Sequence, residues 1–386
     1  MTAAGAAQTP PMAEWQEAGG PQAARWRSPG GNPTPRRIVA ADDTLTADAA
    51  YRLACEGTAL LWRGDFQNAR QMLQALGRRV DRKAHGGGKS VAEFPEAFHR
   101  KRMAQAQRAR ILGMLLIPFD AGHLIPLRRA PDVRDACMEA LEPADAPYVM
   151  SLRELLGLVG AHEWRRKGVS IPALGGRIHP HYGVFSPVRG EYVALVAGVP
   201  LPAAVAANSL AFDVGTGTGV LAAVLARRGI RRVVATDQDE RALACTRDNV
   251  ARLGLGDTVE PVRADLFPPG RAPLVVCNPP WVPGKPSSAL EYAVYDPDSR
   301  MLRGFLAGLV AHLEAGGEGW LILSDLAEHL KLRSRETLLE WIGNAGLKVL
   351  GRHDVRPTHA KASDPDDPLH AARAAEITSL WRLGAA

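Results

Sequence analysis

The sequence predicts an α/β protein, in which a mainly helical N-terminal domain precedes a parallel sheet covered by helices on both faces. Two observations lead to this class. Between residues 41 and 168, apolar residues recur at intervals of three and four, as on one face of a helix. From residue 169 to residue 386, short apolar runs alternate with helical patterns, and this alternation is typical of β-α-β units.

Residues 1–40 come before both patterns. They are rich in Ala, Gly and Pro and show no periodicity. A stretch of this composition buries little apolar surface, so we expect it to lack a fixed structure.

Five helical patterns follow in the N-terminal domain, and Thr46 is placed to cap the first of them. They cover residues 46–64, 66–80, 95–116, 131–141 and 149–166. We therefore expect residues 41–168 to form a helical domain that recognises the substrate.

The C-terminal domain, residues 169–386, reads as strands separated by helices. The expected strands are residues 210–215, 231–237, 259–266, 273–280 and 319–325. The expected helices are residues 219–229, 240–254, 300–317 and 333–346. Two further strands, residues 347–355 and 374–383, could close the sheet as an antiparallel edge.

Composition and charge restrict the classes of protein. The four cysteines have neither a disulfide framework nor metal-ligand spacing, so we expect no metal and a reducing, cytoplasmic location. The longest apolar stretch, residues 192–214, contains Pro200 and Pro202, which makes it a poor membrane span and predicts a soluble protein. The formal net charge is +6. Within it, residues 78–110 hold ten Lys and Arg against three acids, which suggests a partner that carries phosphates.

A glycine loop follows the first expected strand. Asp213, Gly215, Gly217 and Gly219 end the strand and open a helix, where free backbone N–H groups and close backbone approach suit a cofactor. Val220 stands where the dinucleotide-binding fingerprint has a third small residue, so the loop fits that fingerprint imperfectly. Asp237 and Asp265 end the next two strands. Their positions suit an adenosine, with Asp237 on the ribose hydroxyls and Asp265 on the adenine amine.

The stretch 278–281, Asn-Pro-Pro-Trp, ends the fourth strand of this order. The four motifs together resemble the class I S-adenosylmethionine-dependent methyltransferases over roughly residues 180–384, and the subgroup with an Asn-Pro-Pro-aromatic motif in particular. That resemblance implies a Rossmann-like sheet of seven strands and S-adenosylmethionine as cofactor. It also implies cofactor-binding positions at Asp213, Gly215, Thr216, Gly217, Gly219, Asp237, Gln238, Asp265, Leu266, Phe185, Pro187 and Glu191.

The same resemblance gives Asn278, Pro279, Pro280 and Trp281 a catalytic role in methyl transfer to a nitrogen on a planar group. The Asn278 side-chain oxygen and the Pro279 carbonyl can each accept one N–H hydrogen bond. The two prolines fix φ and stiffen the turn, and Trp281 offers a ring for stacking. No strong general base is needed, because the methylated nitrogen is acidic enough to lose its proton.

Several motifs near these residues lead to further expectations. Arg189 and Tyr192 could border the pocket with Phe185, Pro187 and Glu191, whereas His179, His181 and Tyr182 read as structural. Residues 293–302 fit a loop that covers the substrate. The stretch 84–90, Ala-His-Gly-Gly-Gly-Lys-Ser, ends like a phosphate loop, but Lys83 stands where the motif needs Gly, which excludes an NTPase.

The acceptor remains open between alternatives. The basic residues between Arg78 and Arg110 favour an exocyclic amine of a base in nucleic acid, with RNA ahead of DNA. Glutamine methylation of a translation protein is the alternative enzyme. From other classes, a nicotinamide-dependent dehydrogenase and a catalytically silent RNA-binding relative are also consistent with a glycine loop in such a sheet.

Overall fold

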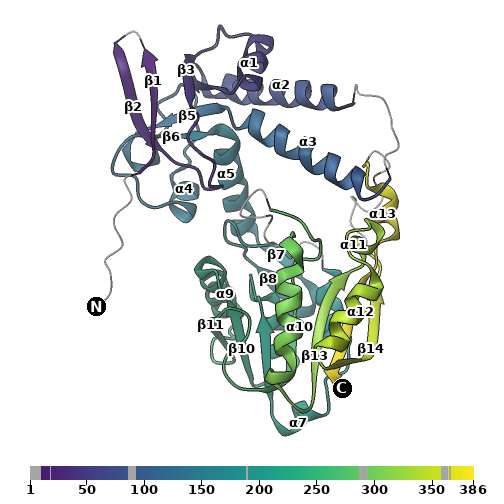
Figure 1. Cartoon of the computed structure of the whole chain (residues 1–386). Coiled ribbons are helices and arrows are strands. Elements are labelled where there is room, and N and C mark those ends of the chain that lie inside the picture. The colour runs from purple at the N-terminus through teal and green to yellow at the C-terminus, as the bar shows by residue number, and fades with distance from the viewer. Residues whose placement is uncertain are drawn as a thin grey trace, which may run out of the picture. The chain divides into compact units, whose positions relative to one another are not determined.

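The computed structural model describes residues 10–17, 19–85, 93–187, 190–286, 291, 294–357, 364 and 367–386. The chain divides into two compact units, and each is described by itself (Figure 1). The N-terminal unit comprises Met1–Val91 and Arg100–Glu163, and the C-terminal unit comprises Ala92–His99 and Trp164–Ala386.

Six strands of the N-terminal unit form a closed barrel in the order β1-β2-β6-β5-β4-β3. They are β1 (Met12–Glu17), β2 (Gly20–Trp26), β3 (Arg37–Ala41), β4 (Thr58–Trp62), β5 (Leu115–Phe119) and β6 (Tyr148–Ser151). The helices along this part of the chain are α1 (Ala47–Cys55), α2 (Phe66–His85), α3 (Glu96–Leu112), η1 (Ala121–His123), α4 (Arg134–Ala140) and α5 (Leu152–Lys167). As expected, the Thr46 side chain accepts the Ala49 N–H at the start of α1.

The expectation that residues 1–40 lack a fixed structure is wrong for residues 12–17, 20–26 and 37–40, which lie in β1, β2 and β3. Along β1 the buried and exposed positions alternate, with Ala13 and Trp15 buried. The pairing of β1 with β2 places Trp15 and Trp26 in one apolar cluster of the barrel. Burial of two indole rings compensates for the low apolar content of this stretch.

The N-terminal unit is also less helical than predicted, because β4 falls inside a range that reads as helix and β5 and β6 overlap the ends of two others. All five residues of β4, from Thr58 to Trp62, are buried, and so are all five residues of β5. A short run that is apolar on both faces has the same appearance in a buried strand and in a buried helix. Periodicity alone therefore could not separate the two.

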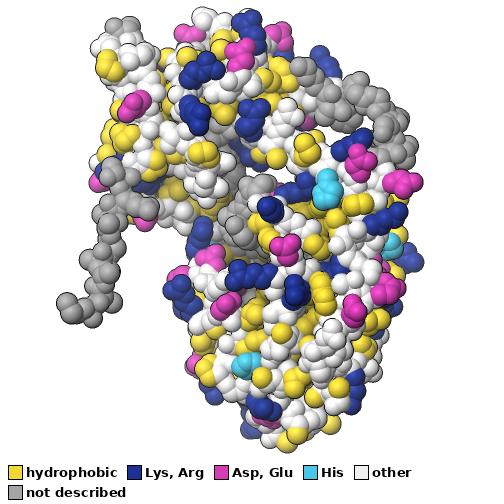
Figure 2. Space-filling view, viewed as in Figure 1, with side chains coloured by type: hydrophobic (Ala, Val, Ile, Leu, Met, Phe, Trp, Pro, Cys, Tyr) yellow, Lys and Arg dark blue, Asp and Glu magenta, His cyan; other side chains and the backbone are white. Residues whose placement is uncertain are grey.

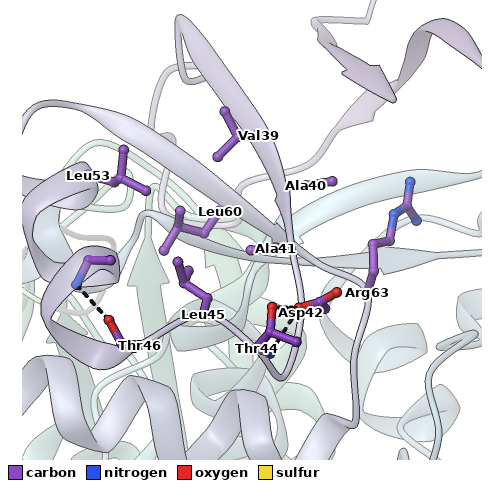
Figure 3. A pocket seen from close by; sticks show the side chains of 11 residues that line it. Val39, Ala40, Ala41, Asp42, Thr44, Leu45, Thr46, Leu53, Leu60 and Arg63 are labelled. Atoms are coloured by element: carbon purple, nitrogen blue, oxygen red, sulfur yellow. Dashed lines mark hydrogen bonds between the residues drawn. The ribbon is translucent and has the colours of Figure 1, made fainter. Parts of the chain in front are cut away.

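A hollow of about 560 Å³ lies in the N-terminal unit beside β3 and α1 (Figure 3). Its lining is largely apolar, with Leu45, Leu53 and Leu60 among the side chains. The carboxylate of Asp42 accepts hydrogen bonds from the backbone and the hydroxyl of Thr44. The hollow therefore combines apolar side chains with polar ones, among them Thr44, Thr46 and Arg63.

The C-terminal unit contains the predicted seven-stranded sheet, in the order β11-β10-β9-β12-β13-β15-β14. Its strands are β9 (Leu210–Val214), β10 (Arg232–Asp237), β11 (Val259–Arg263), β12 (Ala272–Cys277), β13 (Leu313–Ser324), β14 (Leu347–Val355) and β15 (Thr378–Ala385). The first five are parallel, and β15 is antiparallel to both of its neighbours. The antiparallel strand thus lies between β13 and β14 and not at the edge.

The helices of this unit are α6 (Glu191–Gly198), α7 (Ala204–Ala207), α8 (Val220–Arg227), α9 (Glu240–Arg252), η4 (Pro297–Ser299), α10 (Arg300–His312), α11 (Leu326–His329), α12 (Arg335–Asn344) and α13 (His370–Ala375). A two-stranded sheet, β7 (Val169–Ile171) with β8 (Gly176–Ile178), precedes them around η2 (Pro172–Leu174). Alternate residues of β12 enter two cores. Leu274 and Val276 pack with α6 and α8, whereas Val275 and Cys277 pack with α10 and α12.

Strand order determines where a ligand can bind. Strand β9 is flanked by β10 on one side and by β12 on the other, and the chain runs outward from β9 in both directions. In such sheets, ligands bind outside the carboxyl ends of the strands at this switch point. Cys277 of β12 pairs with Val214 of β9, so the residues that follow them, Asn278 and Gly215, leave the sheet side by side.

Candidate functional site

The glycine loop after β9 brings backbone close to the switch point. Gly215, Gly217 and Gly219 have φ values of 73°, 56° and 79°, in the left-handed region that favours glycine. A Cβ at Gly219 would lie 2.8 Å from the Thr246 side chain, and the Thr246 hydroxyl donates to the Gly217 carbonyl at 3.1 Å. The loop therefore requires glycine and packs on α9.

Asp213 is a buried carboxyl beneath this loop. Its Oδ2 accepts the Thr216 hydroxyl at 2.7 Å and the Ala222 N–H at 3.1 Å. Burial raises the pKa of Asp213 to about 6; the two hydrogen bonds oppose the shift and the nearby charge of Asp237 adds to it. Positive charge on a ligand would stabilise the ionised form of this carboxyl.

Asp237 ends β10 beside the same loop. Its carboxylate accepts the Gly217 N–H at 3.1 Å and the Asp239 N–H at 3.0 Å, and burial raises its pKa. Gln238, which follows, is exposed, although its backbone N–H also donates to Asp237.

The third strand end lies next to Asp237. The Ala264 N–H donates to the Asp237 carbonyl, and the Thr236 hydroxyl donates to the Leu266 carbonyl at 2.5 Å. Leu266 has a φ of 72°, and Asp265 is exposed. The structure thus brings together the ends of β9, β10 and β11, which carry Asp213, Asp237 and Asp265.

The Asn-Pro-Pro-Trp turn begins where β12 ends. Trp281 Nε1 donates to Asn278 Oδ1 at 2.8 Å, so the indole and the amide oxygen face each other. An amide oxygen has two lone pairs, and one remains for a second donor. Pro279 is buried, and Pro280 and Trp281 are half-buried. The prolines and this hydrogen bond fix the direction of the amide.

Trp281 is held from one side by the start of α6. The ring of Tyr192 meets the Trp281 ring edge to face, with centroids 6.4 Å apart. Burial raises the pKa of Tyr192, and the charges of Asp213 and Glu191 add to the shift, so both acids lie within electrostatic reach of this phenol. Phe185 is half-buried and Pro187 is buried, and Arg189 lies outside the described residues.

The loop that follows the turn is held by a carboxyl the sequence did not single out. Asp296 is buried and accepts the N–H groups of Met301 and Leu302, at 3.0 and 3.1 Å, which caps α10. Its own backbone N–H donates to the Val282 carbonyl. Asp298 and Ser299 next to it have positive φ values of 54° and 52°, and non-glycine residues in this region mark strain.

A buried arginine joins the turn to this loop. The Arg333 guanidinium is 6% exposed and donates to the Trp281 carbonyl at 3.4 Å and to the Ser299 hydroxyl at 3.3 Å. Burial lowers its pKa. In the sequence, Arg333 stands among other basic residues in "KLRSRET" and looks like part of a solvated surface. Only its burial distinguishes it.

The beginning of α3 also packs beside the turn, within the same unit. Phe98 is 4% exposed and shares an apolar cluster with Val282 and Leu330, against which Trp281 packs. Its ring lies 6.3 Å from the ring of Tyr295. Residues far upstream in the sequence thus form part of the surroundings of Trp281.

Comparison with known proteins now adds a family. Residues 176–345 match the methyltransferase small domain. This part of the chain, less than half of its length, is similar to that family. The match confirms the predicted class I methyltransferase domain and supports S-adenosylmethionine as its cofactor, and it gives no support to a nicotinamide-dependent dehydrogenase.

Curated relatives of the methyltransferase domain differ in what their names say they act on. A ribosomal protein L11 methyltransferase of Sorangium cellulosum is 36% identical over 40% of this chain and 40% of its own. A tRNA1(Val) (adenine(37)-N6)-methyltransferase of Bacteroides thetaiotaomicron is 30% identical over 32% of this chain and 56% of its own. A release factor glutamine methyltransferase of Mycobacterium tuberculosis is 34% identical over 33% of this chain and 44% of its own.

This chain therefore spans about half the length, or less, of these three relatives. Among solved structures, the ribosomal protein L11 methylase of Lactobacillus delbrueckii subsp. bulgaricus matches at 16% identity and a TM-score of 0.32, covering 50% of this chain and 75% of that one.

The residues of the methyltransferase domain fit this cofactor. S-adenosylmethionine carries a sulfonium and an ammonium group, both positive, and Asp213 is a buried acid whose ionised form needs such a neighbour. The three positive-φ glycines have no side chain, so a ligand can approach the backbone of this loop closely. Within the described residues, no cluster of His, Cys, Asp and Glu could hold a metal, and no helix is long and apolar enough to cross a membrane.

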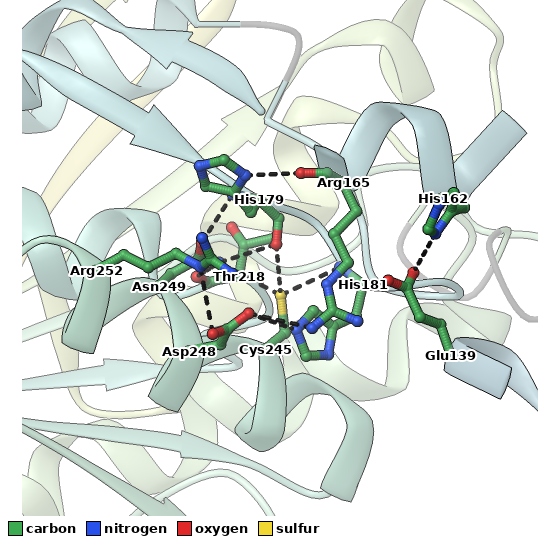
Figure 4. Close-up of polar contacts among 10 residues, drawn as sticks. All are labelled: Glu139, His162, Arg165, His179, His181, Thr218, Cys245, Asp248, Asn249 and Arg252. Carbon is green, nitrogen blue, oxygen red and sulfur yellow. Dashed lines mark hydrogen bonds and ion pairs between the residues drawn. The ribbon is translucent and has the colours of Figure 1, made fainter. Parts of the chain in front are cut away.

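The histidines before the glycine loop contact other parts of the fold. His179 Nδ1 lies 2.7 Å from the Arg165 carbonyl oxygen, and His181 Nε2 lies 3.2 Å from Asp248 Oδ2 (Figure 4). Asn249, which the sequence did not single out, accepts the His179 N–H at 2.7 Å and donates to the Thr218 carbonyl at 3.0 Å. It links this segment to the glycine loop.

The predicted basic segment lies on α2 and α3 of the N-terminal unit. Among its arginines, Arg79 pairs with Asp48 at 2.7 Å and Arg108 with Asp81 at 2.8 Å. The stretch 86–90, which includes Lys89, lies outside the described residues. On the visible face of the molecule, Lys and Arg side chains occur together with Asp and Glu side chains (Figure 2). The positive charge is therefore less concentrated than the sequence count indicates.

Proposed function

We propose that this protein is an S-adenosylmethionine-dependent N-methyltransferase that acts on a nitrogen attached to a planar group. The observation that carries the proposal is the position of Asn278 and Trp281 at the carboxyl end of β12, directly beside the glycine loop of β9. Hydrogen-bond acceptors and a ring beside the glycine loop support this proposal.

The cofactor roles follow the strand ends. Asp213 and the glycine loop bind the methionine part, Asp237 the ribose and Asp265 the adenine. The burial of Asp213 and Asp237 supports the first two assignments, and the exposed Asp265 can reach an adenine at the rim. The remaining proposed contacts are Gly215, Thr216, Gly217, Gly219, Gln238, Leu266, Phe185, Pro187 and Glu191.

S-adenosylmethionine supplies an electrophilic methyl group on a positively charged sulfur. Asn278 Oδ1 and the Pro279 carbonyl accept the two N–H groups of the acceptor and turn its lone pair toward that methyl. Trp281 stacks on the planar group, and Tyr192 and Arg333 hold Trp281 in place. Orientation of this kind can lower a barrier by about 7–11 kcal/mol. The proton leaves after transfer, so no side chain is assigned as a strong base.

The proposed acceptor is the exocyclic amine of a base in RNA. Such an amine has two N–H donors and a flat ring, which match the two acceptors and the indole. A relative named as a tRNA adenine-N6 methyltransferase supports this choice. The exposed basic residues of α3, among them Arg100 and Arg110, offer positive charge to a phosphate backbone.

The second candidate is glutamine in a translation protein. A glutamine side-chain amide is also planar with two N–H donors, and one relative is named as a release factor glutamine methyltransferase. The two acceptors of the turn would serve either group. The difference lies in the rest of the substrate.

One labelling experiment separates the two. The purified protein and cell extract are incubated with S-adenosylmethionine that carries a radioactive methyl group, and RNA and protein are then digested separately. We expect label in methylated nucleosides. Label in methylglutamine would replace RNA by a protein acceptor, and label in neither, with S-adenosylhomocysteine still bound, would favour a catalytically silent relative.

A further inference from the structure

An exposed tryptophan stands beside cations at the end of α5, in the C-terminal unit. Trp164 has 52% of its surface exposed, whereas the other seven tryptophans are buried or half-buried. Arg165, Arg166 and Lys167 follow it directly, and the last two are exposed. An exposed indole offers a flat face on which a base can stack, and the cations beside it offer charge to phosphates.

Two other elements add positive charge at the same place. The Arg177 guanidinium, from β8, donates to the Lys167 carbonyl at 2.8 Å. From α9, Arg252 and Asp248 are 3.3 Å apart, and Asp248 also meets Arg165 at 3.2 Å (Figure 4). The end of α5, the two-stranded sheet of β7 and β8, and α9 thus contribute to one cationic surface.

This surface holds more cations than acids. Asp248 faces Arg165, Arg252 and His181, so one carboxylate is shared by two permanent cations and a histidine. Glu163, one helical turn before Arg166 and Lys167, is the other nearby acid in the sequence. We call Trp164, Arg165, Arg166, Lys167, Arg177 and Arg252 the α5 patch; its six members carry five positive charges.

The α5 patch is connected to the methyl-transfer site through one short segment. His179, two residues after Arg177, has its ring on the Arg165 carbonyl and its N–H on Asn249. Asn249 in turn holds the Thr218 carbonyl in the glycine loop. Hydrogen bonds therefore connect the patch to the glycine loop within the C-terminal unit.

We propose that the α5 patch binds single-stranded nucleic acid beside the methylated nucleotide, with one base stacked on Trp164 and phosphates on Arg166, Lys167 and Arg177. The proposal rests on the proposed RNA methylation. Stacking on an exposed aromatic ring with cations along the backbone is how single strands are bound without regard to sequence. An acidic protein would satisfy the cations but would leave the indole without a matching flat group.

The test measures binding and needs no turnover. A fluorescein-labelled 12-nucleotide single-stranded RNA of mixed sequence is titrated with the protein and S-adenosylhomocysteine at several salt concentrations, and a DNA of the same sequence forms a second arm. We expect Trp164→Leu to weaken RNA binding roughly tenfold and Trp164→Phe to retain most of it. Equal binding by wild type and Trp164→Leu would overturn the proposal.

The cations are tested through salt dependence. Each phosphate contact to a single strand contributes about 0.7 to the slope of log K against log salt. The double variant Arg166→Ala/Lys167→Ala should therefore lower the slope by about 1.4. The matched control, Lys348→Ala/Arg356→Ala, removes two exposed cations elsewhere in the unit and should leave the slope unchanged. Equal slopes in both double variants would refute the assignment.

The two proposals can fail separately. If RNA is methylated while the patch variants bind it normally, the α5 patch is not the binding surface and the proposed function stands. If protein is methylated but the patch variants still lose RNA affinity, the surface stands and the acceptor is wrong. Melting temperatures of all variants are measured first, and Trp164→Phe serves as the folded reference.

Discussion

In the protein without cofactor, the stability that the Asp213→Asn variant gains over wild type should be larger at pH 8 than at pH 4. The unfolded carboxyl has a pKa of 3.8, and burial raises the folded value to about 6. Between these values the folded state holds a proton that the unfolded state has lost, so the free energy of unfolding falls as pH rises. The full loss is about 3 kcal/mol, and about 2.5 kcal/mol of it falls between pH 4 and pH 8.

The asparagine side chain of the Asp213→Asn variant has no such titration, although its oxygen can still accept from Thr216 and Ala222. The difference in melting temperature between variant and wild type should therefore grow by roughly 5–10 °C from pH 4 to pH 8, given the usual response of a domain of this size. Thermal unfolding followed by circular dichroism at both pH values measures it. Asp265→Asn, at an exposed strand end, is the control and should show no such growth.

As pH rises, the cofactor affinity of wild type should increase while its stability without cofactor falls. Wild type should bind S-adenosylhomocysteine more tightly as pH rises through 6, because ionised Asp213 faces the ligand ammonium group, while Asp213→Asn should bind more weakly with little pH dependence. Isothermal titration calorimetry gives both. A difference in melting temperature that is the same at pH 4 and pH 8 would show that folding does not raise the pKa of Asp213, and the reasoning would be refuted.

Three other substitutions test the site. Asn278→Ala should lower kcat about a hundredfold or more through lost orientation and leave the Kd of S-adenosylhomocysteine unchanged; a change confined to that Kd would contradict the acceptor role. Gly219→Ala should destabilise the protein by about 2 kcal/mol in urea unfolding, since φ is 79° and the Cβ would lie 2.8 Å from the Thr246 side chain. Arg333→Met should raise the KM for the acceptor about tenfold at constant cofactor affinity, with partial rescue in Arg333→Lys, whereas equal loss in both variants would indicate a purely structural role.

The C-terminal domain could be predicted from the sequence because its signals are local. Strands β9, β10 and β12 are short apolar runs, and Asp213, Asp237 and Asn278 mark where they end. The position of β15 could not be read in this way, because strand order depends on pairing between distant residues. The pairing of Trp381 with Leu321 on one side and Arg352 on the other places β15 inside the sheet.

The N-terminal unit was harder to predict, since its barrel depends on the pairing of strands, which composition does not reveal. Trp15 and Trp26 are buried only because β1 and β2 meet other strands, although the alternation around Trp15 was a visible signal. Arg333 and Asn249 were missed for a similar reason. An arginine in a basic stretch and an asparagine in a helix have no sequence feature that reports their burial.

The packing of Phe98 against Tyr295 means that the catalytic unit is not one continuous piece of sequence. The family match begins at residue 176, yet Phe98 and, from the other end of the chain, Leu369 cover the apolar surface around Val282 and Leu330. A chain cut at the limits of the family would expose that surface to water. Substitutions near residue 98 should accordingly alter the acceptor preference of a site almost two hundred residues downstream. A domain exchange that uses only the family limits would separate Phe98 from that site.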